Sequence, residues 1–223
     1  MSPENGPVNS QPGSDRLKLW HDYYSDKRMA HHAAQLDLVG KYHRSGRILE
    51  IGPGFGLMTA ALANAGHDVA TLDVIDREFA FPDVQHLRRD LTAIAPGDLD
   101  EFDTILCCET LEHIAWDSVG KVLTALRRDG RVLIVSVPYE AFQIFFSFYV
   151  NRYEVRERFA LKKLRFLKRF KPVDGYMHHK WEVGYRGNSL AEWEAKLKET
   201  GWAIVDRSFP SSVRSVFHVL RPA

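Results

Sequence analysis

Short apolar runs alternate with longer amphipathic segments from residue 47 onward. A short apolar run bounded by turn residues is typical of a buried strand, and helix-length patterns follow several of these runs. Alternation of this kind predicts an α/β domain with a mainly parallel sheet and helices on both faces. We expect strands near 47–51, 68–73, 84–88, 102–107 and 131–137, and helices near 56–65, 117–127 and 189–200.

The two ends of the pattern differ from its middle. Residues 15–44 carry apolar positions at helical spacing, so we expect helix before the first strand. Near the C-terminal end, apolar segments at 203–209 and 214–220 are separated only by a short Pro-Ser-Ser loop. Two such strands are expected to pair as a hairpin, which places one antiparallel strand in an otherwise parallel sheet.

A glycine-rich turn follows the first predicted strand. Gly52, Gly54 and Gly56 alternate with other residues and precede a helix. Glycine lacks a Cβ, so the backbone of such a turn can approach a ligand closely. The second predicted strand ends in Asp73, which lies 17 residues after Gly56. Ligands of open α/β sheets bind at the carboxyl ends of the strands, where an acid can hold both ribose hydroxyls of a nucleoside.

The chemistry of this turn argues against a dinucleotide. The dinucleotide fingerprint is G-x-G-x-x-G, whereas the glycines here follow G-x-G-x-G. Glu50 also lies two residues before the first glycine, where its carboxylate would repel a pyrophosphate. A carboxylate suits a cationic ligand with an ammonium or sulfonium group. An NAD-dependent oxidoreductase with an altered glycine loop therefore stays an alternative that Glu50 disfavours.

The motif of an acid, an apolar residue and G-x-G-x-G resembles the class I S-adenosylmethionine-dependent methyltransferases. Their second acid ends strand two, as Asp73 does, and a third acid near the end of strand three, here Asp90, meets the adenine amino group. The segment from Glu109 to His113 resembles the "LEH" signature of small-molecule methyltransferases, which include enzymes that O-methylate quinone precursors. The resemblance covers residues 47–138 and, less strongly, 189–221.

This resemblance implies a Rossmann-like methyltransferase fold with a seven-stranded, mostly parallel sheet, and S-adenosyl-L-methionine as the cofactor. Helices before the first motif commonly lie over the cofactor in this family, so Trp20, Tyr23, Tyr24 and Arg28 are expected near it. The cofactor-binding residues implied are Glu50, Gly52, Pro53, Gly54, Gly56, Asp73, Val74, Asp90, Leu91, Cys108, Glu109 and Tyr24.

A hydroxyl acceptor needs a general base, whereas an amine needs only a free lone pair. Imidazole is suited to this role because its unperturbed pKa is about 6.5. We expect the base among His113, His178 and His179, with the last two preferred because Trp181 and Glu182 follow them. A metal site from these histidines and Glu112 is conceivable, but the spacing does not demand one. His31 and His32 are expected to be a solvated pair.

The segment 139–187 is expected to be an insertion that forms a lid. Residues 142–150 contain four phenylalanines and one tyrosine. Residues 152–171 contain nine Lys or Arg and two Glu, so by subtraction this segment carries +7 and the rest of the chain −6. Ala160, Leu161, Leu164 and Leu167 recur at helical spacing, which predicts a basic amphipathic helix. The aromatic and basic segment 142–171 therefore indicates either an anionic membrane surface as partner or an acceptor lid.

Composition limits the remaining possibilities. The chain has 223 residues, 45% hydrophobic content and a formal net charge of +1, which favours one globular domain and disfavours a nucleic-acid partner. We expect a disordered tail at 1–14 and a single methyltransferase domain at 15–223. Adjacent Cys107 and Cys108 are poor disulfide partners, and with no apolar signal segment they favour a cytoplasmic protein, peripheral on a membrane at most.

The sequence thus predicts a methyltransferase acting on a hydroxyl or amine of a small or lipid-linked acceptor. A non-catalytic cofactor-binding subunit is the remaining alternative. The identity of the acceptor and the oligomeric state are not determined by these residues.

Overall fold

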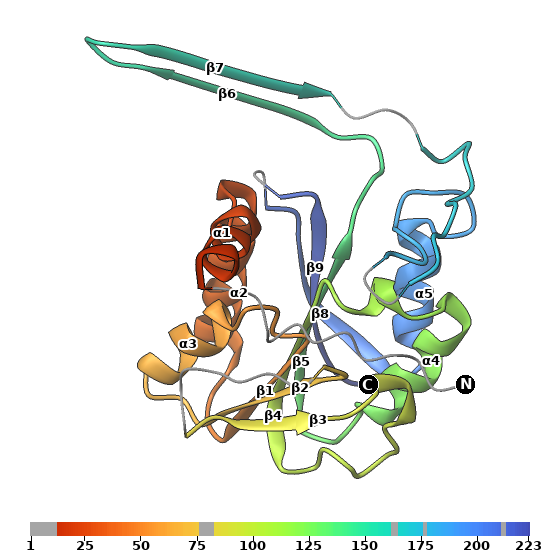
Figure 1. The fold of residues 1–223 in the computed structure, drawn as a ribbon. Helices are drawn as coiled ribbons and strands as arrows, with labels where there is room; N and C mark the ends of the chain where they lie inside the picture. The colour runs from red at the N-terminus through yellow and green to blue at the C-terminus, as the bar shows by residue number, and fades with distance from the viewer. Residues whose placement is uncertain (1–12, 76–82, 162–164, 176–177, 211–212) are drawn as a thin grey trace.

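A seven-stranded sheet forms the centre of the computed structural model, which describes residues 13–75, 83–161, 165–175, 178–210 and 213–223 (Figure 1). The strand order is β3-β2-β1-β4-β5-β9-β8. The first five strands pair in parallel, and β9 is antiparallel to both of its neighbours, as predicted. The strands are β1 (Arg47–Ile51), β2 (Val69–Asp73), β3 (Gln85–Arg88), β4 (Phe102–Cys108), β5 (Val132–Pro138), β8 (Trp202–Ser208) and β9 (Ser215–Pro222).

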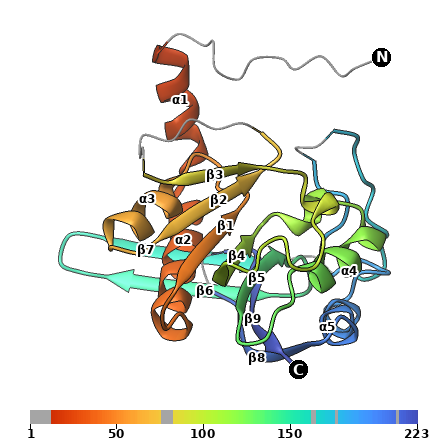
Figure 2. The ribbon, with the colours of Figure 1, turned by 90° about the horizontal axis from the view of Figure 1, so that it is seen from below.

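Helices cover both faces of this sheet (Figures 1 and 2). Buried residues of α2 and α3 form one apolar cluster with the strands, and those of α4 and α5 form another. The helical pattern at 15–44 divides into two helices because Ser25 caps α2, its side chain accepting a hydrogen bond from the N–H of Arg28. The helices are α1 (Gly13–Tyr23), α2 (Asp26–Tyr42), α3 (Leu57–Asn64), α4 (Trp116–Ala125) and α5 (Leu190–Glu199), with 3₁₀ turns η1 (Leu91–Ala93) and η2 (Leu111–His113).

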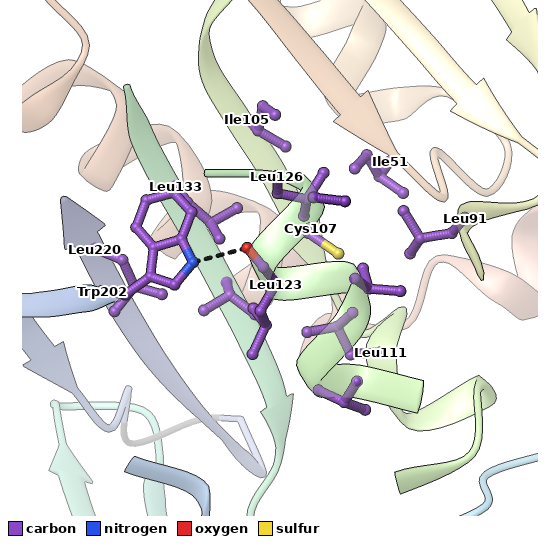
Figure 3. Packing of buried hydrophobic residues seen from close by; sticks show 14 of the residues in the cluster. Ile51, Leu91, Ile105, Cys107, Leu111, Leu123, Leu126, Leu133, Trp202 and Leu220 are labelled. Carbon is purple, nitrogen blue, oxygen red and sulfur yellow. Dashed lines mark hydrogen bonds between the residues drawn. The ribbon is translucent and has the colours of Figure 1, made fainter. Parts of the chain in front are cut away.

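The larger core cluster lies between the sheet and the α4–α5 face (Figure 3). Every residue of β5 is buried, which is typical of a parallel strand with helices on both faces. Trp202 fills the space between β8 and α4, and its indole N–H donates a hydrogen bond to the carbonyl of Leu123 at 2.9 Å. Cys107 is fully buried in the same cluster, and burial raises the pKa of its thiol.

Arg131 ties the amino-terminal ends of the strands together, although it is almost fully buried. Its guanidinium donates hydrogen bonds to the carbonyls of Phe102, Leu126 and Leu99. Burial lowers its pKa to about 10, so the group remains a cation at neutral pH. The side chain thereby links β4, the end of α4 and the loop before β4.

The inserted segment differs from the prediction of a basic helix. Residues 155–161 form strand β7 (Val155–Leu161), which pairs antiparallel with β6 (Ile144–Val150). Residues 162–164, part of the expected helix, lie outside the described residues, and 165–167 form no helix. The physical reason is the alternation of aromatic and β-branched residues at period two, together with a tight turn in which Asn151 Oδ1 accepts the N–H groups of Tyr153 and Glu154.

After the hairpin the chain returns to the domain. Trp181 is buried, and its indole N–H donates to the carbonyl of Ile114. Val183 and Pro138 pair through the backbone, and Gly184 adopts φ 108° where a Cβ would collide with the backbone of Ala141. The predicted tail 1–14 lies outside the described residues except for Gly13 and Ser14, which begin α1. No helix in the described part of the chain is long and apolar enough to cross a membrane.

Replacing Arg131 with leucine should lower the free energy of unfolding by about 3 kcal/mol, because three carbonyls would lose their donor inside the protein. Urea unfolding followed by tryptophan fluorescence measures this change. The matched control is Arg221→Leu, at an exposed position of β9, which should change stability by less than about 0.5 kcal/mol. Equal effects of the two substitutions would contradict the role given to Arg131.

Candidate functional site

A cavity of about 890 Å³ lies at the carboxyl ends of β1, β2 and β4. Ligand sites commonly have volumes of several hundred Å³ and lie at this edge of an open α/β sheet. Ten of the predicted cofactor-binding residues line it, whereas Gly56 and Tyr24 do not. The ten are Glu50, Gly52, Pro53, Gly54, Asp73, Val74, Asp90, Leu91, Cys108 and Glu109.

The glycines of the turn between β1 and α3 all adopt positive φ, a conformation that side chains with a Cβ rarely take. They also permit close packing around the cavity. A Cβ on Gly52 would collide with the hydroxyl of Thr110, and one on Gly54 would collide with the hydroxyl of Tyr23. Gly56 is the N-cap residue of α3 rather than a wall of the cavity.

Glu50 is the buried carboxylate of the cavity. It lies on β1, is only 5% exposed, and accepts a hydrogen bond from the hydroxyl of Thr59 on α3. Burial raises the pKa of Glu50 to about 7, although the hydrogen bonds of Thr59 act in the opposite direction. A carboxyl group with this pKa can give up its proton when a cation enters the cavity.

Two further acids stand at the ends of β2 and β3. Asp73 is the last residue of β2, and its Oδ1 accepts the N–H of Ile75. Asp90 follows β3 and accepts two hydrogen bonds from Thr92 at Oδ1, which fixes its carboxylate at the cavity wall. Both acids line the cavity, and their contacts with ribose and adenine stay predictions.

His31 is not solvated, contrary to the prediction. It is 7% exposed, and its Nε2 lies 3.0 Å from the hydroxyl of Ser136 and 3.6 Å from Glu109 Oε1. Gln35, one turn later on α2, contacts its Nδ1. Positions 31, 35 and 38 share one face of the helix, and this spacing was the signal in the sequence that His31 faces the sheet.

Glu109 is held in an unusual conformation by these partners. Its φ is 51°, the one positive value for a non-glycine residue in the described ranges. Burial by itself would raise its pKa, but the hydrogen bond and Coulombic attraction of His31 outweigh burial and hold the pKa below its usual value. Glu109 therefore presents a carboxylate to the cavity, where the end of β4 would otherwise turn away.

The amino-terminal helices close one side of the cavity. Tyr23 and Arg28 line it, with the guanidinium 3.7 Å from the centre of the tyrosine ring. Tyr24 instead packs behind the wall, where its hydroxyl accepts the N–H of Leu57 at the start of α3. Burial raises the pKa of Tyr24 to about 12, so its hydroxyl stays protonated. His32 packs near Tyr24, and burial lowers the pKa of its imidazole to about 4.

Glu112, His113 and His179 meet at the far end of the cavity from the ends of β2 and β3. The rings of His113 and His179 lie 5.0 Å apart, centre to centre, in an edge-to-face contact. Glu112 is fully buried, and neither of its carboxyl oxygens has a hydrogen-bond partner in the described structure. Burial, reinforced by Glu109, raises the pKa of Glu112 well above its usual value.

Glu182 orients His179 within this cluster. Its Oε1 lies 2.8 Å from Nδ1 of His179, while Nε2 of the same ring lies 3.9 Å from Glu112 Oε1. When Nδ1–H donates to Glu182, the lone pair of Nε2 remains available inside the cavity. Of the neighbouring predicted residues, His178 is exposed and does not line the cavity.

The cluster also has the composition of a cation site. One ligand atom each from Glu112, His113 and His179 lies within 4.8 Å of the others.

Glu182 was noted in the sequence only as a neighbour of the histidines, because its contact with His179 depends on how the segment after the hairpin packs. Sequence spacing could not bring His179 next to Glu112, which is 67 positions earlier.

Comparison with known proteins identifies the family of the chain. A family model described as a methyltransferase domain matches residues 20–205. The chain is 30% identical over 122 residues to a ubiquinone biosynthesis O-methyltransferase of Paracidovorax citrulli, a match that spans 48% of this chain and about half (51%) of the relative. It is 23% identical over 192 residues to the protein of the same name from Hahella chejuensis, spanning 80% of this chain and 75% of the relative.

Solved structures show the same fold. The 1,6-didemethyltoxoflavin-N1-methyltransferase of Burkholderia thailandensis superposes with a TM-score of 0.59 at 18% identity, over 94% of this chain and 86% of that one. The glycopeptide N-methyltransferase MtfA, complexed with S-adenosyl-L-methionine, superposes with a TM-score of 0.58 at 14% identity, over 90% and 96% of the two chains. With the family match over most of its length, the chain belongs to the methyltransferase domain family, and its fold and motifs are those of the class I S-adenosylmethionine-dependent methyltransferases.

Proposed function

We propose that this methyltransferase methylates a hydroxyl group of a small or lipid-linked acceptor, with His179 as the general base. The observation that carries the proposal is the hydrogen bond between His179 Nδ1 and Glu182 Oε1, which leaves Nε2 of this cavity-lining residue to accept a proton. A phenol is the preferred class of acceptor, because its pKa of about 10 lets an imidazole remove the proton far more easily than from an alcohol. The names of the curated relatives, both O-methyltransferases, support oxygen as the acceptor atom.

S-adenosylmethionine fits the cavity by the chemistry of its walls, and when bound it supplies a methyl group on a positively charged sulfur. Glu50 offers the buried carboxylate that a cation requires, Asp73 the acid for the ribose, and Asp90 the acid for the adenine amino group. The remaining cofactor contacts proposed are the turn Gly52–Gly54, with Val74, Leu91, Cys108 and Glu109. Gly56 and Tyr24 contribute indirectly, because they fix the start of α3.

In the proposed reaction the acceptor hydroxyl lies against His179 and loses its proton to Nε2 as its oxygen bonds to the methyl carbon and the bond from that carbon to the donor sulfur breaks, leaving a neutral thioether. Glu182 stabilises the imidazolium that results, in the way that a carboxylate supports a catalytic histidine elsewhere. The walls of the cavity exclude water and hold the two reactants in line, which is the larger part of catalysis for such a transfer.

A second reading of the same cluster deserves a test, because Glu112 lacks hydrogen-bond partners. Glu112, His113 and His179 could hold a divalent cation, which would bind the acceptor hydroxyl and lower its pKa directly. Loss of activity with EDTA, restored by one metal, would favour the cation, whereas unchanged activity favours His179 as the base.

An amine acceptor is the remaining alternative, since the two solved neighbours named above are N-methyltransferases.

Replacing His179 with glutamine should lower kcat about 10²-fold to 10⁴-fold and leave the KM for the methyl donor unchanged, because the base is lost and the cofactor contacts remain. Formation of S-adenosylhomocysteine with a panel of phenols and catechols measures the rate. The matched control is His178→Gln, at the exposed neighbour, which should keep full activity. Full activity of the His179 variant would contradict the base and point to an amine acceptor.

Replacing Asp73 with alanine should weaken S-adenosylmethionine binding about 10-fold to 1,000-fold, because two hydrogen bonds to a charged group are lost. Isothermal titration calorimetry measures the dissociation constant. The control is Asp68→Ala, an exposed acid just before the opposite end of the same strand, which should leave binding unchanged. Equal affinity in both variants would exclude the ribose contact.

Binding of S-adenosylmethionine should weaken about 25-fold as the pH falls from 7.5 to 5.5. The pKa of Glu50 is about 7 in the free protein, so below that pH the cation must displace a proton, whereas above it the carboxylate is already charged. Titrations across this pH range measure the slope. In the Glu50→Gln variant the dissociation constant should not change with pH over this range. A pH dependence that persists in this variant would assign it to another group.

A further inference from the structure

The hairpin of β6 and β7 has two chemically different faces. Residues directly opposite each other in an antiparallel pair lie on the same face, and successive residues alternate between faces. The pairs Phe146 with Phe159 and Val150 with Val155 therefore share a face. This apolar face consists of Ile144, Phe146, Phe148, Val150, Val155 and Phe159, with Glu157 opposite Phe148 as its one charged member.

The opposite face is polar and basic. It presents Ser147 and Tyr149 of β6 beside Arg158 and Arg156 of β7, and Phe145, at the base of the hairpin, is its one large apolar side chain besides Tyr149. Arg152 is also exposed, at the turn between the two strands. The hairpin is thus an amphipathic ribbon with one mainly apolar face and one mainly polar face. Neither burial in the core nor an ordinary position on the surface accounts for this pattern.

Nothing in the described structure covers the apolar face. Its six apolar side chains are each between 57% and 66% exposed. Figure 1 shows the hairpin extending well beyond the seven-stranded sheet, on the side to which β5 points. Contiguous exposed apolar patches of this kind mark interaction surfaces, because they are costly to leave in water.

The hairpin also lacks a third strand. Among the residues that the structure describes, β6 and β7 form a sheet of their own and pair only with each other. An isolated two-stranded sheet is marginally stable in water and gains stability when its apolar face is buried. We therefore expect this face to have a partner in the working state of the protein.

Charge identifies the partner. Between residues 144 and 171 the described residues include seven Lys or Arg and two Glu, and residues 162 and 163 add two lysines to the sequence. Exposed Phe166 and Leu167 lie among these basic residues. Aromatic and aliphatic side chains interleaved with cations are typical of segments that bind the interface of an anionic bilayer.

We propose that the β6–β7 hairpin docks the protein on an anionic lipid surface, with its apolar face in the interfacial layer. A second copy of the chain would bring two strongly positive segments together, so charge disfavours that occupant. Glu157 limits the depth of insertion, because a carboxylate on the apolar face cannot enter the hydrocarbon region cheaply. The hairpin thereby attaches the protein peripherally to the bilayer. The six apolar side chains and the nearby cations each contribute part of the binding free energy.

This inference does not rest on the proposed reaction. Vesicle binding is measured without methyl donor or acceptor, so its failure and the failure of the His179 mechanism are separate results. If both hold, the acceptor is a hydroxyl-bearing amphiphile that the enzyme reaches at the bilayer surface.

The test is co-flotation of the full chain with vesicles of phosphatidylcholine alone, or with about one-third phosphatidylglycerol, at low and high salt. The unmodified protein should float only with the anionic vesicles, and less at high salt. The triple variant Phe146→Ser, Phe148→Ser, Phe159→Ser should partition about 100-fold more weakly. The pair Arg156→Ser, Arg158→Ser should bind about 25-fold more weakly at low salt, and Glu157→Gln about fivefold more strongly.

The matched control is Leu36→Ser with Val205→Ser, which removes exposed apolar side chains on α2 and β8 and should leave flotation unchanged. Circular dichroism and the melting temperature confirm that each variant folds. No flotation at low salt, or equal flotation of the phenylalanine variant, overturns the proposal. A dimer in sedimentation that the phenylalanine variant disrupts, without vesicle binding, would assign the face to a second copy instead.

Discussion

Burial of the central strands on both faces is the constraint on which this structure depends. β5 has no exposed residue, and β1 and β4 are nearly as enclosed, so these strands are almost entirely apolar and helices must connect them across the faces. Polar groups are then confined mainly to the ends of the strands. The carboxyl ends gather Asp73, Asp90 and Glu109 around one cavity, whereas the other end is tied together by Arg131. The exception is Glu50, whose burial raises its pKa and prepares it for a cationic ligand.

The two halves of the cavity are built differently. The cofactor half comes from consecutive strand ends and needs only the parallel sheet. The half that we assign to the acceptor depends on the segment after the hairpin, which Trp181 anchors through its bond to the Ile114 carbonyl. The backbone N–H of Lys180 donates to the carbonyl of Glu112, so His179 is held beside the turn that carries Glu112 and His113. A single insertion thereby carries both the residue that we propose as the base and, in the hairpin, the surface that we propose to meet lipid.

Stability and function compete at two places in this arrangement. Glu112 lies buried without a hydrogen-bond partner, and Glu109 holds a positive φ; both features cost free energy in the isolated domain. The exposed apolar face of the hairpin also costs free energy, because its side chains are in contact with water unless a partner covers them. Unfavourable features of this kind concentrate where a protein binds something, and here all of them belong to the cavity or to the insertion.

The sequence by itself determined the sheet, its connections and the cofactor half of the site, because these follow from local periodicity and from turns a few residues long. Each strand from 47 to 137 lies within one residue of its predicted position. Only the tertiary structure decided the rest. The helix expected at 160–167 was wrong because alternating aromatic residues paired across a turn, and His31 was wrong because its partners Ser136 and Glu109 lie more than 75 residues away. The meeting of His179, Glu182 and Glu112 likewise depends on packing of the returning segment, which no local pattern encodes.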